Sequence, residues 1–417
     1  MRYKVLFLFF LMAIIVGANT LKDTVEFALE NSPEYRKIEI SFERSKRSWE
    51  ITKNNYLPSL TVSGNDSETK SLSVSKKVNE GGTLSYNESE YSNGTDYKSL
   101  SYSQNLTSIK DYQYINSKIN FEISELNFKE ARQKFILNLA NSFYNLIRQK
   151  ERLVIEENSY KRWKNAYDYA VARFDSGAAN KFAVLNAKLN LLNSESSIIS
   201  QKDSYQNSLN LFKKTIGMEL DKEFAPEDPL IFREAIQIEP VKRRDVKISE
   251  RTLEIARINW FRSKLGKRPD IRYSATTSED TLGKTNWTAS LSYSFMLGKS
   301  DNQLNFDIST LELERARINH DLVLKQVKIE KQNMQRKLES SKNTIKIRKE
   351  NLENAQESFN FSEISFQKGL ISFIDLQDSQ LKLTQAKQSY ISALLDNYLL
   401  VLDYILTMGG DIEEHLQ

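Results

Sequence analysis

The sequence predicts a mainly α-helical protein with a smaller β portion, built as a tandem duplication of a strand segment followed by a long helical hairpin. Three observations lead to this fold class. Glycine and proline are scarce, with 13 and 6 in 417 residues, so helices can continue without interruption. Two long segments repeat one another at a constant offset. Short stretches before them alternate between apolar and hydroxyl residues.

The first twenty residues have the pattern of a secretory signal. Arg2 and Lys4 precede an apolar run from Val5 to Val16, and small residues follow at Gly17 and Ala18. The run is too short to span a bilayer as a helix, so we expect export from the cytoplasm and cleavage near Ala18. No later segment is apolar for 18 residues, so any membrane location is expected not to use helices.

Two stretches predict unusually long helices. Neither glycine nor proline occurs between Gly94 and Gly177 or between Gly298 and Gly369. Each stretch begins like a strand and then places apolar residues at helical spacing. If about 65 to 70 residues are helical, each forms a rod of about 100 Å, and helices of about 40 residues follow each rod. The spacing is illustrated by Ile136, Leu139, Phe143 and Leu146.

The two halves are copies of one another. Gly177 corresponds to Gly369 and Gly217 to Gly409 at the same offset, since 369 − 177 = 192 and 409 − 217 = 192. The sequence LSYS at 100–103 recurs at 291–294. An ungapped register that aligns both boundary glycines predicts a duplication in which each copy is a strand segment followed by a helical hairpin.

The strand segments have one apolar and one hydroxyl face. The stretches IRYSATT, from Ile271, and TASLSYSFML, which includes Phe295 and Leu297, show this alternation. Strands of about ten residues, apolar outward and polar inward, are typical of an outer-membrane barrel wall, although a soluble sheet with one wet face would look the same. Candidate strands of the longer first copy lie around Leu60, Leu72, Leu84 and Leu100, with a turn at 79–82.

The strand count predicts assembly. The copies together supply about four to six strands, fewer than the roughly eight that close even a small barrel. A sheet in lipid cannot leave its edges unpaired, so several chains must share one barrel if these strands lie in a membrane.

The predicted segments follow from these patterns. They are a signal peptide at 1–18, N-terminal helices at 19–56, a first outer-membrane strand segment at 57–106, a first long hairpin at 107–217, a mixed equatorial connector with the entry helix of the second copy at 218–268, a second strand segment at 269–298, a second long hairpin at 299–409 and a tail at 410–417.

Composition excludes several classes of function. The 59 basic and 55 acidic residues are interspersed, so no basic face for nucleic acid is expected. There is no cysteine and there are two histidines, so we expect no metal site, disulfide or lipidated cysteine. His320 is expected mid-rod, facing solvent or a neighbouring helix. No nucleophile elbow or glycine-rich phosphate loop is present, so we expect neither an enzyme nor a cofactor.

The order of several motifs resembles the TolC-type outer-membrane efflux proteins. They are LKDTVEFALENSPEY, where Ser32-Pro33 would start a helix, NNYLPSL, RFDSGAANKFAVLNAKLNLL through TIG at 215–217, GKRPDIRYS, and SFQKGLISFIDLQDSQ through TMG at 407–409. The resemblance covers nearly the whole mature chain, and the first strand segment is longer than the common family pattern.

The resemblance implies a homotrimer in the bacterial outer membrane that extends into the periplasm. All chains would contribute strands to one barrel, in contact with lipid, and helices to a long α-helical tunnel. Such proteins are the exit ducts of tripartite efflux pumps and type I secretion systems, and their partners are a periplasmic adaptor and an inner-membrane transporter.

The resemblance also implies a constriction at the periplasmic tip, where the hairpins turn at Gly177 and Gly369. Asp375 and Asp378 match paired acids that narrow the tunnel entrance in the family. The alternative for Asp375 is helix capping, because Ser372 lies three residues before it. The first copy has Ala183 and Asn186 at the two equivalent places.

Two tip positions depart from the family. Many members have an Arg two residues after the second glycine and a Tyr three residues before it, where this chain has Ile371 and Phe366. The Asp that such an Arg can pair with corresponds to Ala183. We therefore expect closure by apolar contact, with little dependence on ionic strength.

Two other classes of protein remain as alternatives. A periplasmic adaptor is also a long hairpin protein, but it has one hairpin and a following β-rich region. An exported coiled-coil scaffold without a pore would explain the rods, but it leaves the alternating strands and the glycine-marked turns unexplained.

Overall fold

A computed structural model describes residues 20–64, 69–78, 82–91, 93–106, 112–177, 180–228, 232–234, 241–294 and 301–416. The expected signal peptide, Phe295, Leu297 and most of the 79–82 turn lie outside these residues. The chain divides into two compact units, described separately below. One comprises Met1–Lys37, Arg132–Val241 and Glu330–Gln417, and the other comprises Ile38–Ala131 and Lys242–Ile329.

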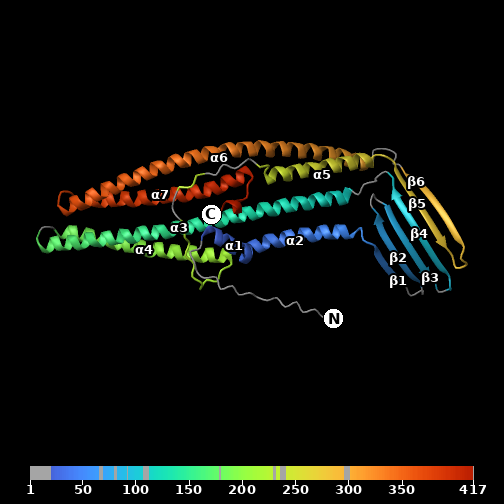
Figure 1. The fold of residues 1–417 in the computed structure, drawn as a ribbon, viewed down its shortest axis with the longest axis horizontal. Coiled ribbons are helices and arrows are strands. Elements are labelled where there is room, and N and C mark those ends of the chain that lie inside the picture. The colour runs from blue at the N-terminus through green and yellow to red at the C-terminus, as the bar shows by residue number, and fades with distance from the viewer. Residues whose placement is uncertain are drawn as a thin grey trace. The chain divides into compact units, whose positions relative to one another are not determined.

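The long helices confirm the predicted rods and their shorter partners. Helix α3 (Tyr112–Asp175) has 64 residues and α6 (Asp301–Gln367) has 67. The returning helices, α4 (Lys181–Ile216) and α7 (Phe373–Met408), have 36 residues each. Figure 1 shows two hairpins, α3 with α4 and α6 with α7. The remaining helices are α1 (Leu21–Asn31), α2 (Pro33–Asn54), α5 (Arg244–Gly266) and the short 3₁₀ helix η1 (Ile412–His415).

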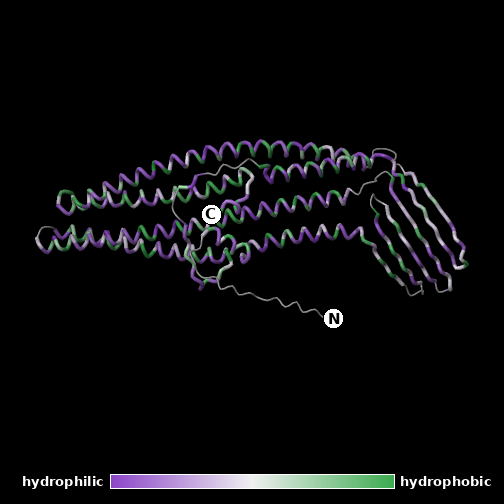
Figure 2. Tube along the Cα trace, viewed as in Figure 1, coloured by the Kyte–Doolittle hydropathy of each residue, from purple (hydrophilic) through white to green (hydrophobic). Residues whose placement is uncertain are grey.

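The first unit is held together by the apolar faces of its helices. The four α3 residues that illustrate helical spacing, Ile136, Leu139, Phe143 and Leu146, are all 0% exposed. The face of α7 that includes Leu395 and Ile405 is equally buried. Hydrophobic and hydrophilic residues are interspersed along these helices in Figure 2, as expected for helices with one buried side.

Helix α7 qualifies one expectation. Among the described helices, it is the one long and apolar enough to cross a membrane, which the sequence was expected to lack after residue 20. The expectation considered unbroken apolar runs, whereas α7 has a low density of charges among its apolar residues. Half of its most apolar window is buried inside the protein, as in the core helix of a soluble protein.

Each copy ends at a glycine that allows close approach of another backbone segment. Gly217 and Gly409 cap α4 and α7 in the left-handed region, with φ of 77° and 96°. A Cβ on Gly217 would lie 2.1 Å from the carbonyl oxygen of Asn31, and one on Gly409 would lie 2.6 Å from that of Val241. The duplication therefore preserves both the cap and the crossing segment.

The second unit contains one six-stranded antiparallel sheet, in the order β1-β2-β3-β4-β5-β6. Six strands is the upper end of the predicted range. The first copy supplies β1 (Ser59–Gly64), β2 (Lys70–Val78), β3 (Gly82–Glu90) and β4 (Asp96–Asn105), and the second supplies β5 (Asp270–Glu279) and β6 (Thr285–Ser294). Figure 1 shows the strands side by side, with β1 and β6 at the two edges.

Candidate functional site

In each hairpin the glycine that follows the long helix has a left-handed backbone conformation. Gly177 and Gly369 adopt φ of 76° and 74°, which the absence of a side chain makes accessible. In the second copy, the Gly369 N–H donates to the Phe366 carbonyl and the Leu370 N–H donates to the Ser365 carbonyl, both at 2.9 Å. These two bonds form a Schellman motif, which ends α6 and reverses the chain within a few residues.

Asp375 is the N3 residue of a complete capping box at the start of α7. Its backbone N–H donates to the Ser372 hydroxyl oxygen at 3.3 Å, and its carboxylate accepts from the Ser372 N–H at 3.0 Å and from the hydroxyl at 2.6 Å. The bonds from the Ser372 hydroxyl and then its N–H hold the pKa of Asp375 below its ordinary value of 3.8. The side chain is therefore a carboxylate at neutral pH, and the predicted capping role is confirmed.

Capping alone does not require the acid, because the first copy begins the equivalent helix without one. There, Asn180 caps α4 by accepting a hydrogen bond from the Ala183 N–H at 3.0 Å. Ala183 occupies the place of Asp375 and cannot complete a capping box. The carboxylate of Asp375 is thus an addition to a helix start that folds without it elsewhere in the same chain.

Asp378 lies one turn further along α7. Its carboxylate accepts from the Lys382 ammonium at 2.6 Å, and the two side chains are 61% and 67% exposed. An exposed pair at this i,i+4 spacing contributes little to stability. Sequence reasoning found Asp378 and missed this partner, although the spacing of four residues was visible. The aspartate has a water-accessible charge, partly offset by the lysine.

Phe366 and Ile371 lie in an apolar cluster beside the turn. Phe366 is 9% exposed and belongs to a buried group in which Ile371 also packs. Its ring centroid lies 5.3 Å from that of Tyr169, in the first hairpin, and 5.9 Å from that of Phe373. The cluster therefore joins the two hairpins near their turns. Its other members are Phe359, Leu376, Leu383, Leu352 and Ala355.

Neutral hydrogen bonds cross the same seam between the hairpins. The Tyr169 hydroxyl donates to the Gln367 carbonyl at 2.8 Å. The side-chain amides of Asn190 and Gln377 each donate to the other at 3.2 Å. Gln380, which is 2% exposed, donates to the Ser159 hydroxyl at 3.1 Å. Sequence reasoning missed these contacts, because isolated amides on helix faces have no distinguishing period.

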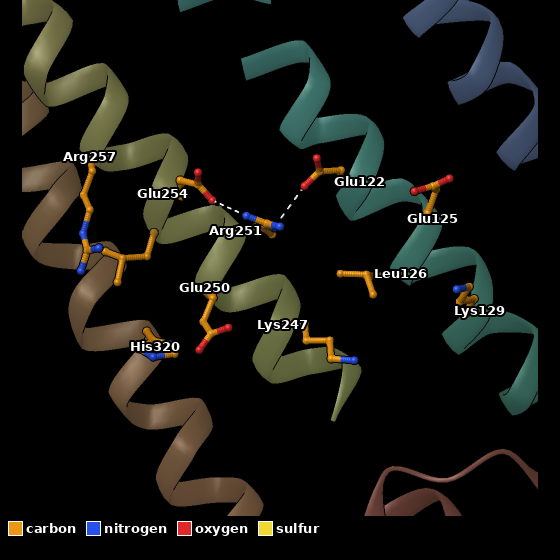
Figure 3. A pocket seen from close by; sticks show the side chains of 11 residues that line it. Glu122, Glu125, Leu126, Lys129, Lys247, Glu250, Arg251, Glu254, Arg257 and His320 are labelled. Carbon is orange, nitrogen blue, oxygen red and sulfur yellow. Dashed lines mark hydrogen bonds and ion pairs between the residues drawn. The ribbon is translucent and has the colours of Figure 1, made fainter. Parts of the chain in front are cut away.

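The second unit contains a charged groove of about 830 Å³. Figure 3 shows Arg251 of α5 between Glu122 of α3 and Glu254, with ion-pair distances of 3.1 and 2.7 Å. The Glu254 hydrogen bond is the largest cause that raises the pKa of Arg251. Four carboxylates and four bases line the groove, so their charges balance.

His320 is at the edge of this groove, on α6. Its Nδ1 lies 2.9 Å from the Ser249 hydroxyl of α5, so it contacts a neighbouring helix as expected. No group of three potential metal ligands occurs among the residues that the structure describes.

Comparisons with known proteins identify the fold. Residues 24–218 match the sequence model of the outer membrane efflux protein family. A search of curated proteins gives no match. Among solved structures, the chain is similar to CusC, with a TM-score of 0.75 and 15% identity over 94% of this chain and 92% of that one. VceC from Vibrio cholerae has a TM-score of 0.75 and 14% identity, over 94% of this chain and 96% of that one. The open state of MtrE from Neisseria gonorrhoeae has a TM-score of 0.72 and 16% identity, over 94% of this chain and 89% of that one.

The fold is thus a duplicated helical hairpin with a six-stranded sheet, and it is similar to the folds of the outer membrane protein VceC and the outer membrane channel MtrE. The match to the outer membrane efflux protein family covers just under half of the chain, and the similarity in fold to CusC covers 94% of it.

Proposed function

We propose that this protein is the outer-membrane exit duct of a tripartite efflux pump or type I secretion system. Three copies would form it and dock with a periplasmic adaptor and an inner-membrane transporter. The observation that carries the proposal is the combination, in one chain, of the duplicated hairpins with a two-faced sheet whose edge strands β1 and β6 are exposed along their whole length. Six strands cannot close a barrel alone, and open edges are not tolerated in lipid, so the sheet needs further copies.

Asp375 and Asp378 would form the selective constriction at the periplasmic tip. Both side chains are exposed in the single chain, and symmetric copies of the same turn would bring like charges together. Carboxylate rings favour cations. The tip turns at Gly177 and Gly369 would place these charges at the tunnel entrance.

The first test is electrical. Purified protein in a planar bilayer should give single-channel currents, cation-selective and blocked by a multivalent cation added on the side of the hairpin turns. A detergent-solubilised mass of three chains and a heat-dependent gel shift should accompany them. A folded trimer without currents, even when its adaptor is added, would favour the pore-free scaffold, and a stable monomer would favour an adaptor-like protein.

Closure of the tip is expected to depend little on ionic strength. The side chains of the cluster around Phe366 and of the Asn190–Gln377 pair are uncharged, and salt screens charges but not these contacts. The Arg162 guanidinium lies 5.4 Å from the Phe359 ring centroid, so its partner in the cluster is an aromatic ring instead of an acid. We expect the probability of spontaneous opening to change less than about twofold between about 0.1 and 1 M salt, as measured by single-channel recording.

A matched double variant provides the comparison for this measurement. Ala183→Asp together with Ile371→Arg introduces the ionic partners that many relatives have at these places. Its opening should become more frequent as salt rises, because a surface ion pair is screened. A wild-type channel with equally strong salt dependence would contradict closure by neutral contacts.

A further inference from the structure

The sheet contains one hairpin more than the duplication requires. LSYS of β4 recurs in β6, and each of these strands directly precedes a long helix, so β4 corresponds to β6 and β1 to β5. Strands β2 and β3 therefore form an inserted pair in the first copy. They are full members of the sheet, since β2 pairs with β3 over nine residues and β3 with β4 over nine.

We propose that this insertion makes the barrel eighteen-stranded, with a wide, weakly selective lumen for large hydrated solutes. The inference rests on the proposed trimer: six strands in each of three copies give 6 × 3 = 18. The supporting evidence is the chemistry of the two faces, which stays in phase across all six strands.

One face of the sheet carries mostly hydroxyl groups, and the charged Lys77, Asp270 and Arg272 lie on this face near the end of the strands that joins the helices. Ser75 pairs with Ser85, Ser85 with Ser101, and Ser101 with Thr276. Thr276 in turn pairs with Thr288 of β6. The side chains also bond across strands, as at Ser274 and Ser290, whose oxygens lie 2.6 Å apart. Over most of its height this wall consists of neutral hydroxyl groups, which are suited to water and offer little charge discrimination.

The opposite face is apolar in its middle, with aromatic residues among the aliphatic ones. It is charged where the strands approach their loops, for example at the Lys98–Glu88 pair, 3.3 Å apart. An apolar band that ends in charged residues matches a lipid-facing wall. Tyr102 lies across Gly82, where a Cβ would be 2.7 Å from its hydroxyl oxygen, so β3 of the inserted pair is packed into this face. The apolar members are Leu60, Val62, Leu72, Val74, Leu84, Tyr86, Leu100, Tyr102, Ile271, Tyr273, Ala275, Trp287, Ala289, Leu291 and Tyr293.

The strand number sets the width of the lumen. With strands about 4.8 Å apart and tilted by about 40°, eighteen strands give a backbone radius of about 18 Å. Without β2 and β3 each copy would supply four strands, and the resulting 4 × 3 = 12 strands would give a radius of about 12 Å. Barrels of 16 to 18 strands enclose an aqueous channel. Most side chains on this face are as small as serine and threonine and leave most of that width open, so the barrel itself would select the cargo only weakly.

Spin-label distances test the strand number directly. The chain contains no cysteine, so Ser101→Cys and Leu100→Cys introduce single labelling sites on opposite faces of β4. In a trimer with eighteen strands, three-fold related backbone positions at this level lie about 31 Å apart, against about 21 Å for twelve strands. We expect the distance between labels at Ser101 to be shorter than the distance between labels at Leu100. The mean of these two distances should lie near the value of about 31 Å expected for eighteen strands.

Deletion of residues 65–90 is the matched control. It removes β2 and β3 and connects β1 to the β3–β4 turn in the correct direction, with the same residues on each face. Its mean distance should fall by about 10 Å. A wild-type trimer with a mean near 21 Å, or with the Leu100 distance the shorter, would overturn the inference and leave the proposed duct intact. A preparation that is not trimeric would overturn both.

Discussion

The double variant Asp375→Asn/Asp378→Asn should lose the block by a multivalent cation, with the blocking concentration raised by about tenfold or more. In three copies the change removes six like charges, three at each of two levels one helical turn apart, and the affinity of a multivalent ion depends on several of them at once. Asparagine keeps the size and leaves the Ser372 cap in place, so the charge is what changes. Single-channel recordings of block and of reversal potential in a salt gradient give the result.

The control variant removes the same number of charges elsewhere on the second hairpin. Glu350→Ala/Glu353→Ala has the same spacing of three residues on the exposed surface of α6 and should leave the block unchanged. If the multivalent cation blocks the asparagine variant as strongly as the wild type, Asp375 is only a helix cap and Asp378 only the partner of Lys382, and the two acids form no constriction.

Among glycine-to-alanine substitutions in the two hairpins, Gly217→Ala should lower the stability of the protein most. The new Cβ would lie 2.1 Å from the Asn31 carbonyl oxygen, a backbone atom, and φ is 77°. For alanine the left-handed conformation costs about 1 to 2 kcal/mol and the overpacking about 1 to 3 kcal/mol. We therefore expect the free energy of unfolding to fall by about 2 to 5 kcal/mol. The apparent unfolding temperature in detergent should fall by several degrees, with Gly409→Ala behaving alike.

Gly177→Ala separates the two contributions to this loss. Its φ of 76° is almost the same, but among the described residues other than its neighbours in the chain, none has an atom within 4 Å of the added Cβ. The free energy of unfolding of Gly177→Ala should fall only by the cost of the left-handed conformation, about 1 to 2 kcal/mol. Equal losses at the two glycines would mean that the crossing segment moves aside, and that close approach at residue 217 has no energetic role.

The fold could be predicted because its signals are local and repeated. Helical spacing over Ile136 to Leu146, alternation over Ile271 to Ala275 and the constant offset between Gly177 and Gly369 each report geometry within a few residues. The Ser372 cap followed from a spacing of three. The duplication then supplied the long-range pairing that periodicity alone does not provide.

The seam between the hairpins could not be predicted in the same way. The contact between Asn190 and Gln377 joins residues 187 positions apart, and neither belongs to a recognisable motif. The crossing of Gly217 by the backbone of Asn31 leaves no trace in the sequence beyond a glycine. Contacts of this type depend on which helix faces meet, and that is decided by packing of the whole unit.

The acids of the proposed constriction and the apolar seam belong to the same short segment. Phe366, Ile371, Asp375 and Asp378 all lie within thirteen consecutive residues at the turn of the second hairpin. Outward movement of that turn would separate the apolar contacts and draw the carboxylates away from the axis in one step. The same segment would then both close the entrance and select cations. A wider opening would therefore discriminate less between ions.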